Sequence, residues 1–279
     1  MQIRTPKISH YKKILEDYNI RPSKRFGQNF IFDKNIFNKI ASLIEPDQCD
    51  MVIEIGPGLG GLSESLIELG AKKILLIEKD KQFIPILKKL KDIHNKRIEI
   101  QNADALNYDF GSLEEERIRV ISNLPYNIAT KILTKLLISQ FKNPKFDKMT
   151  LMFQKEVADR IVAKHHTKMY GRLSIISQYM YHCESSFDLN PSVFYPPPKI
   201  DSSVVTFNYL NRYTKPNIAI LEEITRLAFG QRRKKIKSSL KKIISEENLI
   251  KKYNINPDLR PEDLSVEDYI KLSYLYEKN

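Results

Sequence analysis

The sequence predicts an α/β fold with a doubly wound, mostly parallel sheet, followed by a small C-terminal all-α domain. Short apolar runs alternate with amphipathic helical stretches from Met51 to about Tyr209, which is typical of parallel strands joined by helical crossovers. A glycine-rich turn follows the first of these runs directly. After residue 214 the strand signals stop, and a helical pattern continues toward the C-terminus.

The apolar runs and the stretches between them define the expected elements in order. The expected strands are Met51–Ile55, Lys73–Ile77, Arg97–Ile100, Arg117–Ser122, Lys148–Phe153 and Ser203–Tyr209. The expected helices include Gly61–Leu69, Lys81–Lys91 and Ala129–Gln140, the last with Ile132, Leu133, Leu136 and Leu137 spaced as a buried face. We expect a basic N-terminal arm over residues 1–30, a sheet domain over 31–214 and a helical domain over 215–279.

The chain of 279 residues carries a net charge of +12, and the excess lies in two segments. Residues 1–30 hold seven lysines and arginines and two acids, and residues 231–252 hold nine and two. Such segments could grip a nucleic-acid backbone, although lysine-rich faces also occur on ordinary solvated surfaces. Cys49 and Cys183 lie far apart without ligand spacing, so no metal site is indicated. No apolar run approaches the length of a membrane span, and we expect a cytoplasmic protein, with an organelle left open.

The first strand ends in Glu54 and Ile55, followed by Gly56-Pro57-Gly58-Leu59-Gly60-Gly61, where glycines let the backbone turn sharply beside a ligand. The spacing also satisfies G-x-G-x-x-G, so a nicotinamide dinucleotide enzyme is a competing interpretation. Glu78 ends the second strand and suits a ribose diol in either cofactor, while Asp104 follows the third strand, where an adenine amine could donate to it. These acids, with no Lys or Arg in the loop, favour S-adenosylmethionine over NAD.

The tetrapeptide Asn123-Leu124-Pro125-Tyr126 follows the fourth expected strand and presents an amide, a carbonyl and an aromatic ring together. An ordinary strand-to-helix turn is the competing interpretation, since Asn and Pro are common there. The Asn123 oxygen and the Leu124 carbonyl could accept the N6 hydrogens of an adenine, while Tyr126 stacks on its ring. These bonds would favour a tetrahedral nitrogen whose lone pair can attack an activated methyl group, without a side-chain base.

Seven motifs occur in order along the chain: Gly27–Phe30, Glu54–Leu59, Asn123–Ile128, Gln154–Val157, Tyr170–Ser174, Phe194 with Pro196–Ser202, and Phe229 with Gln231–Lys234. Together they resemble the KsgA family, the small-subunit (16S) ribosomal RNA adenine N6,N6-dimethyltransferases. The resemblance implies a seven-stranded Rossmann-like methyltransferase sheet and S-adenosylmethionine as cofactor. It also implies dimethylation of two adjacent adenines in a hairpin loop near the 3′ end of small-subunit rRNA, in immature 30S particles. We expect a monomer.

Matched residue by residue, the resemblance implies where the cofactor and the target bind. The implied cofactor contacts are Asn29, Ile31, Gly56, Glu78, Asp104 and Asn123. The implied target-adenine pocket is formed by Asn123, Leu124, Pro125 and Tyr126, with Phe194 as an aromatic that stacks near the base; core packing is the alternative for Phe194. Gln231–Lys235 would face rRNA. Gly60-Gly61 is more glycine-rich than the family pattern, and residues 1–20 have no clear counterpart in it.

Two further functions stay open. A large-subunit rRNA adenine N6-methyltransferase of the macrolide-resistance type shares the Asn-x-Pro-Tyr motif, but the Gly-Pro-Gly-Leu loop and the triple proline argue against it. A noncatalytic RNA-binding assembly factor could keep the same fold. The intact Asn123–Tyr126 motif and the acids at the strand ends argue against lost activity.

Overall fold

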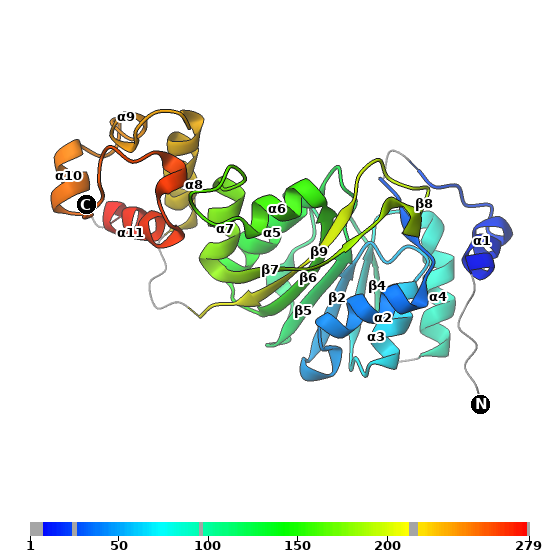
Figure 1. The fold of residues 1–279 in the computed structure, drawn as a ribbon. Helices are drawn as coiled ribbons and strands as arrows, with labels where there is room; N and C mark the ends of the chain where they lie inside the picture. The colour runs from blue at the N-terminus through cyan, green and yellow to red at the C-terminus, as the bar shows by residue number, and fades with distance from the viewer. Residues whose placement is uncertain (1–7, 24–26, 95–96, 212–216, 278–279) are drawn as a thin grey trace. The chain divides into compact units, whose positions relative to one another are not determined.

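The computed structural model describes residues 8–23, 27–94, 97–211 and 217–277 and divides into two compact units (Figure 1). The first unit comprises residues 1–155 and 185–207, and the second comprises 156–184 and 208–279. Residues 156–184 thus group with the late helices, whereas the sequence analysis placed all of 31–214 in one sheet domain. The expected boundary at residue 214 lies in 212–216, outside the described residues.

The sheet has the strand order β4-β3-β2-β5-β6-β9-β7, and the pairings β4–β3, β3–β2, β2–β5 and β5–β6 are parallel. The strands are β2 (Met51–Ile55), β3 (Ile74–Glu78), β4 (Ile98–Asn102), β5 (Ile118–Asn123), β6 (Phe146–Gln154), β7 (Tyr181–Leu189) and β9 (Ser202–Tyr209). Every residue of β2 and β3 is buried, and all of them except Glu54 and Glu78 are apolar, as expected for strands covered on both faces. The predicted α/β class with a mostly parallel seven-stranded sheet is confirmed.

Among the seven strands of the sheet, β7 is the one that the apolar-run pattern does not predict. It lies at the edge of the sheet, and most of its residues are exposed or half-buried, including His182, Glu184 and Asp188. An edge strand needs no continuous apolar run, which explains the omission. Other strand ends differ by one or two residues, and one such shift makes Asn123 the last residue of β5.

After the N-terminal helix, four further helices belong to the sheet unit: α2 (Lys34–Leu43), α3 (Gly61–Glu68), α4 (Ile84–Ile93) and α5 (Ala129–Lys142). Figure 1 shows α2, α3 and α4 grouped beside the half of the sheet that contains β2 and β4. The predicted buried face of α5 is confirmed. The helix expected over Lys81–Lys91 begins instead as a 3₁₀ turn, and α4 starts beside Pro85, where a missing N–H is tolerated. The 3₁₀ turns are Pro46–Gln48, Lys81–Phe83, Phe110–Ser112, Pro191–Val193 and Pro261–Asp263.

The N-terminal segment is folded onto the sheet unit. Helix α1 (Ile8–Asp17) buries Tyr11 and Leu15 in the same core as the residues of α2 and α3. Further along, β1 (Phe30–Ile31) pairs antiparallel with β8 (Phe194–Tyr195). The expected basic arm therefore contains a packed helix, while the lysines and arginines within 1–7 and 24–26 lie outside the described residues.

The second unit has its own core. It contains α6 (Lys155–Val162), α7 (Arg172–Met180), α8 (Ile218–Gly230), α9 (Ile236–Ser239), α10 (Glu246–Lys251) and α11 (Val266–Glu277). The ring of Phe229 lies between those of Tyr170 and Tyr269, with centroid distances of 6.3 and 6.0 Å. This cluster explains why the segment around Tyr170 groups with the late helices. None of the helices in the described ranges has both the length and the apolar character needed to span a membrane.

Candidate active site

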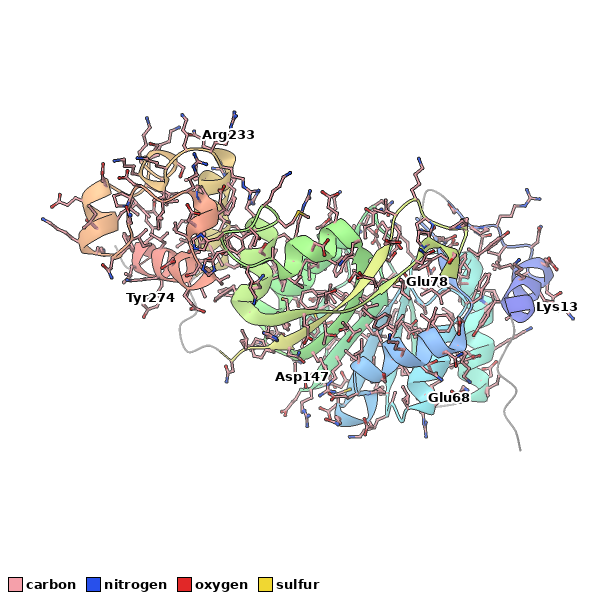
Figure 2. The ribbon with its side chains drawn as sticks, in the orientation of Figure 1. Lys13, Glu68, Glu78, Asp147, Arg233 and Tyr274 are labelled. Atoms are coloured by element: carbon pink, nitrogen blue, oxygen red, sulfur yellow. The ribbon has the colours of Figure 1, made fainter. Side chains whose placement is uncertain are left out.

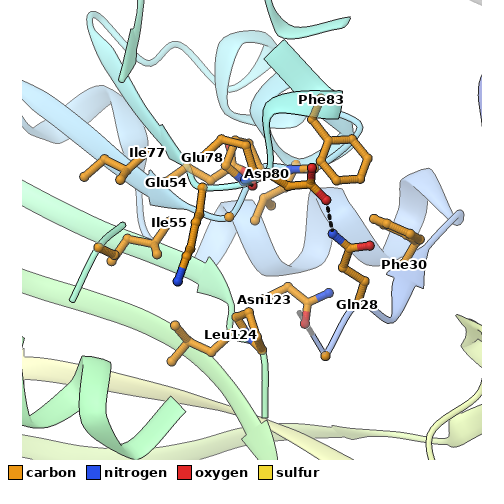
Figure 3. A pocket seen from close by; sticks show the side chains of 18 of the residues that line it. Gln28, Phe30, Glu54, Ile55, Ile77, Glu78, Asp80, Phe83, Asn123 and Leu124 are labelled. Atoms are coloured by element: carbon orange, nitrogen blue, oxygen red, sulfur yellow. Dashed lines mark hydrogen bonds between the residues drawn. The ribbon is translucent and has the colours of Figure 1, made fainter. Parts of the chain in front are cut away.

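A cavity of about 290 Å³ lies where the chain leaves the carboxyl ends of β2, β3, β4 and β5 (Figure 3). The strand order places β3 on one side of β2 and β5 on the other, so successive connections diverge at this point. Open α/β sheets bind ligands in the crevice formed by such a divergence. The cavity is lined by the glycine loop, the acids that follow the strands, the Asn123–Tyr126 turn and residues 27–31.

The glycine loop takes conformations that other residues adopt rarely. Gly56 has a φ of +70°, and a Cβ atom added there would meet nothing within 4 Å, so the backbone faces open space. Gly61 is required for a different reason, because an added Cβ would lie 2.3 Å from Cε2 of Phe37. Close packing of Phe37 on α3 therefore accounts for the second glycine of the Gly60-Gly61 pair.

Glu78 is held at the end of β3 by two backbone donors. Its Oε2 accepts the N–H of Gly58 at 3.1 Å, and its Oε1 accepts the N–H of Asp80 at 2.7 Å. Burial nevertheless raises the pKa of Glu78 to about 7. The carboxyl group is therefore fixed in position before any ligand arrives.

Glu54 lies deeper in the same cavity and is 2% exposed. The hydroxyl of Ser63 donates a hydrogen bond of 2.5 Å to its Oε2. Burial raises the pKa of Glu54 to about 8, against the stabilising effect of this hydrogen bond on the charged form. A cationic ligand group nearby would favour the ionised carboxylate.

Asp104 is more strongly engaged than its sequence position indicated. Its Oδ2 lies 2.7 Å from Nζ of Lys79, and its Oδ1 accepts the N–H of Leu106 at 3.0 Å. The hydrogen bond from Lys79 lowers the pKa of Asp104 below its usual range. A ligand amine that donates to Asp104 would therefore share this carboxylate with Lys79.

The Asn123–Tyr126 turn is oriented by contacts with distant parts of the chain. The Asn123 Nδ2 donates to the carbonyl of Asn29 at 3.1 Å. This bond fixes the orientation of the side-chain amide and leaves its oxygen, Oδ1, to accept a hydrogen bond from a ligand. The hydroxyls of Tyr126 and Ser202 are 2.5 Å apart, and burial raises the pKa of Tyr126. Leu124 is buried, and the carbonyl of Pro125 accepts the N–H of Ile128. The turn is thus rigid on both sides.

Nearly all the residues expected in the site line this one cavity: Asn29, Ile31, Gly56, Glu78, Asp104, Asn123, Leu124, Pro125 and Tyr126. Phe194 does not line it. The Phe194 side chain is 4% exposed and belongs to the hydrophobic core. Phe194 is the residue of β8 that pairs with Ile31 of β1. In this structure Phe194 therefore has the packing role that the sequence analysis left as its alternative.

Gln28 and Asp80 are site residues that the sequence analysis did not single out. Gln28 Nε2 donates to Asp80 Oδ2 at 2.9 Å, drawn as a dashed line in Figure 3, and Asp80 donates its own N–H to Glu78. The two side chains thereby tie residues 27–31 to the end of β3. Gln28 lies within the Gly27–Phe30 motif, which could have identified it as a site residue from the sequence. Asp80 belongs to none of the seven motifs, and only the three-dimensional structure shows that it lies in the site.

Within the described ranges, no group of three His, Cys, Asp or Glu side chains lies close enough together to bind a metal ion.

The family model for ribosomal RNA adenine dimethylase matches residues 19–278. A ribosomal RNA small subunit methyltransferase A of Agrobacterium fabrum is 39% identical over 264 residues, covering 94% of this chain and 95% of that protein. One of Cereibacter sphaeroides is 40% identical over 264 residues, with the same coverage of both chains.

Solved structures also resemble this fold. The structure of a dimethyladenosine transferase from Plasmodium falciparum superimposes with a TM-score of 0.78 at 25% identity, covering 89% of this chain and 98% of that one. The 23S rRNA methyltransferase ErmE gives a TM-score of 0.68 at 22% identity, covering 90% and 100%, which shows a shared fold.

Proposed function

The chain belongs to the ribosomal RNA adenine dimethylase family, and from this we propose that it is a methyltransferase that uses S-adenosylmethionine to dimethylate N6 of adenines in small-subunit rRNA. The observation that carries the proposal is the single cavity that joins the glycine loop and Glu78 to the Asn123–Tyr126 turn. We further propose that the targets are two adjacent adenines in a hairpin loop near the 3′ end, and that the protein acts as a monomer on immature 30S particles.

The cavity residues fit this cofactor better than a dinucleotide. The carboxyl groups of Glu54, Glu78 and Asp104 all line the cavity, and in their ionised forms they would repel a pyrophosphate but attract a cationic ligand. The lysine that lines the cavity, Lys79, is already bound to Asp104. Glu78 would hold the ribose hydroxyls and Asp104 the adenine amine, while Glu54 lies where a carboxylate could favour the cationic amino-acid end. Gly56 would let the ligand approach the backbone closely.

The methyl donor supplies, when bound, an electrophilic methyl group, so the protein's own task is to place and prepare the amine. Asn123 Oδ1 and the Leu124 carbonyl would accept the two N6 hydrogens, which makes the nitrogen lone pair available for attack. Because the Asn123 amide is held through Nδ2 by Asn29, its acceptor is oriented before the substrate enters. Tyr126, held by Ser202, would keep the adenine ring in plane with these acceptors.

The helical unit would supply phosphate contacts, but its cations are not equivalent. Lys235 forms an ion pair with Asp258 at 3.0 Å, and Arg232 lies 3.5 Å from Glu262. Within the described ranges, no ion pair involves Arg233 or Lys234, and Figure 2 shows Arg233 pointing outward from its helical surroundings. Arg233 and Lys234 are therefore better placed for RNA phosphates than the paired cations.

Mass mapping of methylated adenines in unmethylated 30S particles tests the proposal. We expect two adjacent adenines near the 3′ end of the RNA to gain two methyl groups each, only when S-adenosylmethionine is present. Naked 23S RNA is the matched substrate control for the macrolide-resistance alternative, and binding of the cofactor by calorimetry tests the noncatalytic one. Methylation of 23S RNA with inert 30S particles would reject the proposed substrate, and binding of NADH instead of S-adenosylmethionine would reject the cofactor.

A further inference from the structure

An aromatic stack runs from the wall of the cavity toward the protein surface. Phe30 lines the cavity and stacks on Phe32, with centroids 6.4 Å apart and planes within 4°. Phe32 stacks in turn on Tyr11 of α1 at 5.6 Å, and its ring lies 5.7 Å from that of Tyr195. Phe32 is buried, whereas Tyr195 is 42% exposed, so the stack ends in an accessible ring.

Tyr195 is built into the same scaffold as the target pocket. It is paired with Phe30 in the β1–β8 ladder, and it follows Phe194, which points into the core because side chains alternate along a strand. The proline-rich segment that begins after Tyr195 ends at Ser202, whose hydroxyl contacts Tyr126. Tyr195 is thus connected to the cavity through Phe30, which lines it, and to the Asn123–Tyr126 turn through the segment ending at Ser202.

Positive charge accompanies the exposed ring. Nζ of Lys12 lies over Tyr195, 5.4 Å from the ring centroid. Lys12 and Lys199 are exposed, and no described acidic residue forms an ion pair with either. Ile200, close along the chain, is also 41% exposed. An accessible aromatic ring with a cation over it, and a second exposed lysine four residues further along the chain, is a combination that suits single-stranded nucleic acid.

We propose that Tyr195 and Lys12 form a seat for the nucleotide next to the target adenine. The base stacks on Tyr195, and the ammonium of Lys12 moves from the ring to the phosphate of that nucleotide. Stacking of a base on an aromatic side chain contributes more binding free energy than an exposed cation–π contact, so this exchange is favourable. Because the aromatic stack already fixes Tyr195, little side-chain freedom is lost on binding. The inference rests on the proposed function and adds where the neighbouring nucleotide is held.

The test combines protein variants with removal of a base. The 30S particles are reconstituted with small-subunit RNA in which one nucleotide flanking the target adenine is either intact or abasic, and kcat/KM for methylation of that adenine is measured. Tyr195→Ala should lower kcat/KM on intact RNA by about ten- to a hundredfold, the loss expected for one stacked base. The abasic nucleotide should cost the wild-type protein a similar factor and cost Tyr195→Ala almost nothing more.

Several controls separate this role from a structural one. Tyr195→Phe keeps the ring and should retain activity on intact RNA, and binding of S-adenosylmethionine should be unchanged in both Tyr195 variants. Lys12→Gln should weaken the salt dependence of RNA binding, whereas Lys89→Gln should not, although Lys89 also lies over a tyrosine ring, that of Tyr18, at 5.0 Å.

The outcomes are distinguishable from failure of the proposed function. The seat is refuted if Tyr195→Ala keeps the full kcat/KM of the wild type. It is also refuted if, for the nucleotides on both sides of the target, the abasic substitution lowers the kcat/KM of Tyr195→Ala by the same factor as that of the wild type. In both cases the methyltransferase assignment stands. If the wild-type protein methylates no adenine in 30S particles, the proposed function itself fails. If Tyr195→Ala does not fold, Tyr195→Leu can replace it in the comparison of intact and abasic RNA, because leucine keeps an apolar contact with Phe32.

Discussion

Replacing Glu54 by glutamine should remove a large pH dependence from the stability of the ligand-free protein. Burial raises the pKa of Glu54 to about 8, from an ordinary value of 4.5. Below the ordinary value the carboxyl group is neutral in both states. Between the two values the unfolded chain ionises while the folded protein keeps its proton, so the free energy of unfolding falls as pH rises, and the loss is complete above the folded pKa.

The magnitude follows from the size of this shift. Each unit corresponds to about 1.4 kcal/mol, so the contribution of Glu54 should fall by at most about 5 kcal/mol across the window. Urea denaturation followed by circular dichroism from pH 5 to pH 9 measures it as the difference between wild type and Glu54→Gln. The charge of Glu78 also raises the pKa of Glu54, so the difference measures the titration of Glu54 together with its coupling to Glu78.

Ser63→Ala is the informative companion variant. Its hydroxyl donates to Glu54 and favours the charged form, so removing it should raise the pKa further and extend the pH dependence to higher pH. A difference between wild type and Glu54→Gln that stays constant from pH 5 to pH 9 would refute the reasoning, since it would mean that Glu54 is ionised throughout.

Three other variants test the target turn, the glycine loop and the RNA contact. Asn123→Ala should reduce methyl transfer at least about a hundredfold, because it removes one preorganised acceptor, while calorimetric binding of S-adenosylmethionine remains measurable; substantial dimethyladenosine formation would contradict the pocket. Gly61→Ala should lower the unfolding free energy by about 1–3 kcal/mol in urea, since the new Cβ would lie 2.3 Å from Phe37, and Phe37→Leu should recover part of it. Arg233→Gln combined with Lys234→Gln should weaken 30S binding and reduce the slope of log affinity against log salt by roughly two; an unchanged slope would place the RNA contact elsewhere.

Much of the sheet could be predicted because its central strands are buried on both faces. Apolar runs such as Met51–Ile55 need no knowledge of their neighbours to be recognised. Strand β7 could not be found in this way, because an edge strand with Glu184 and Asp188 exposes part of its length. The grouping of Tyr170 with Phe229 and Tyr269 was equally inaccessible, since it joins rings that are far apart in the chain.

The site was predictable to the extent that parallel strands end at one edge of a sheet. Glu78 and Asn123 each end a strand, and Asp104 comes soon after one, so a pattern of strands already brings them together. The contacts that restrain them were not predictable. The pairing of Asp104 with Lys79 and the bond from Gln28 to Asp80 depend on side-chain positions that no local spacing encodes.

The sequence alone determined the fold class, the acids at the strand ends and the family motifs, because apolar periodicity and residue chemistry are local properties of a chain. Only the tertiary structure decided that Phe194 packs in the core while Tyr195 faces outward, since the β1–β8 register sets which side of the strand each residue occupies. It also decided the raised pKa of Glu54 and the pairing of Lys235 with Asp258. Burial and charge pairing depend on neighbours that lie far away in sequence, and folding alone brings them into contact.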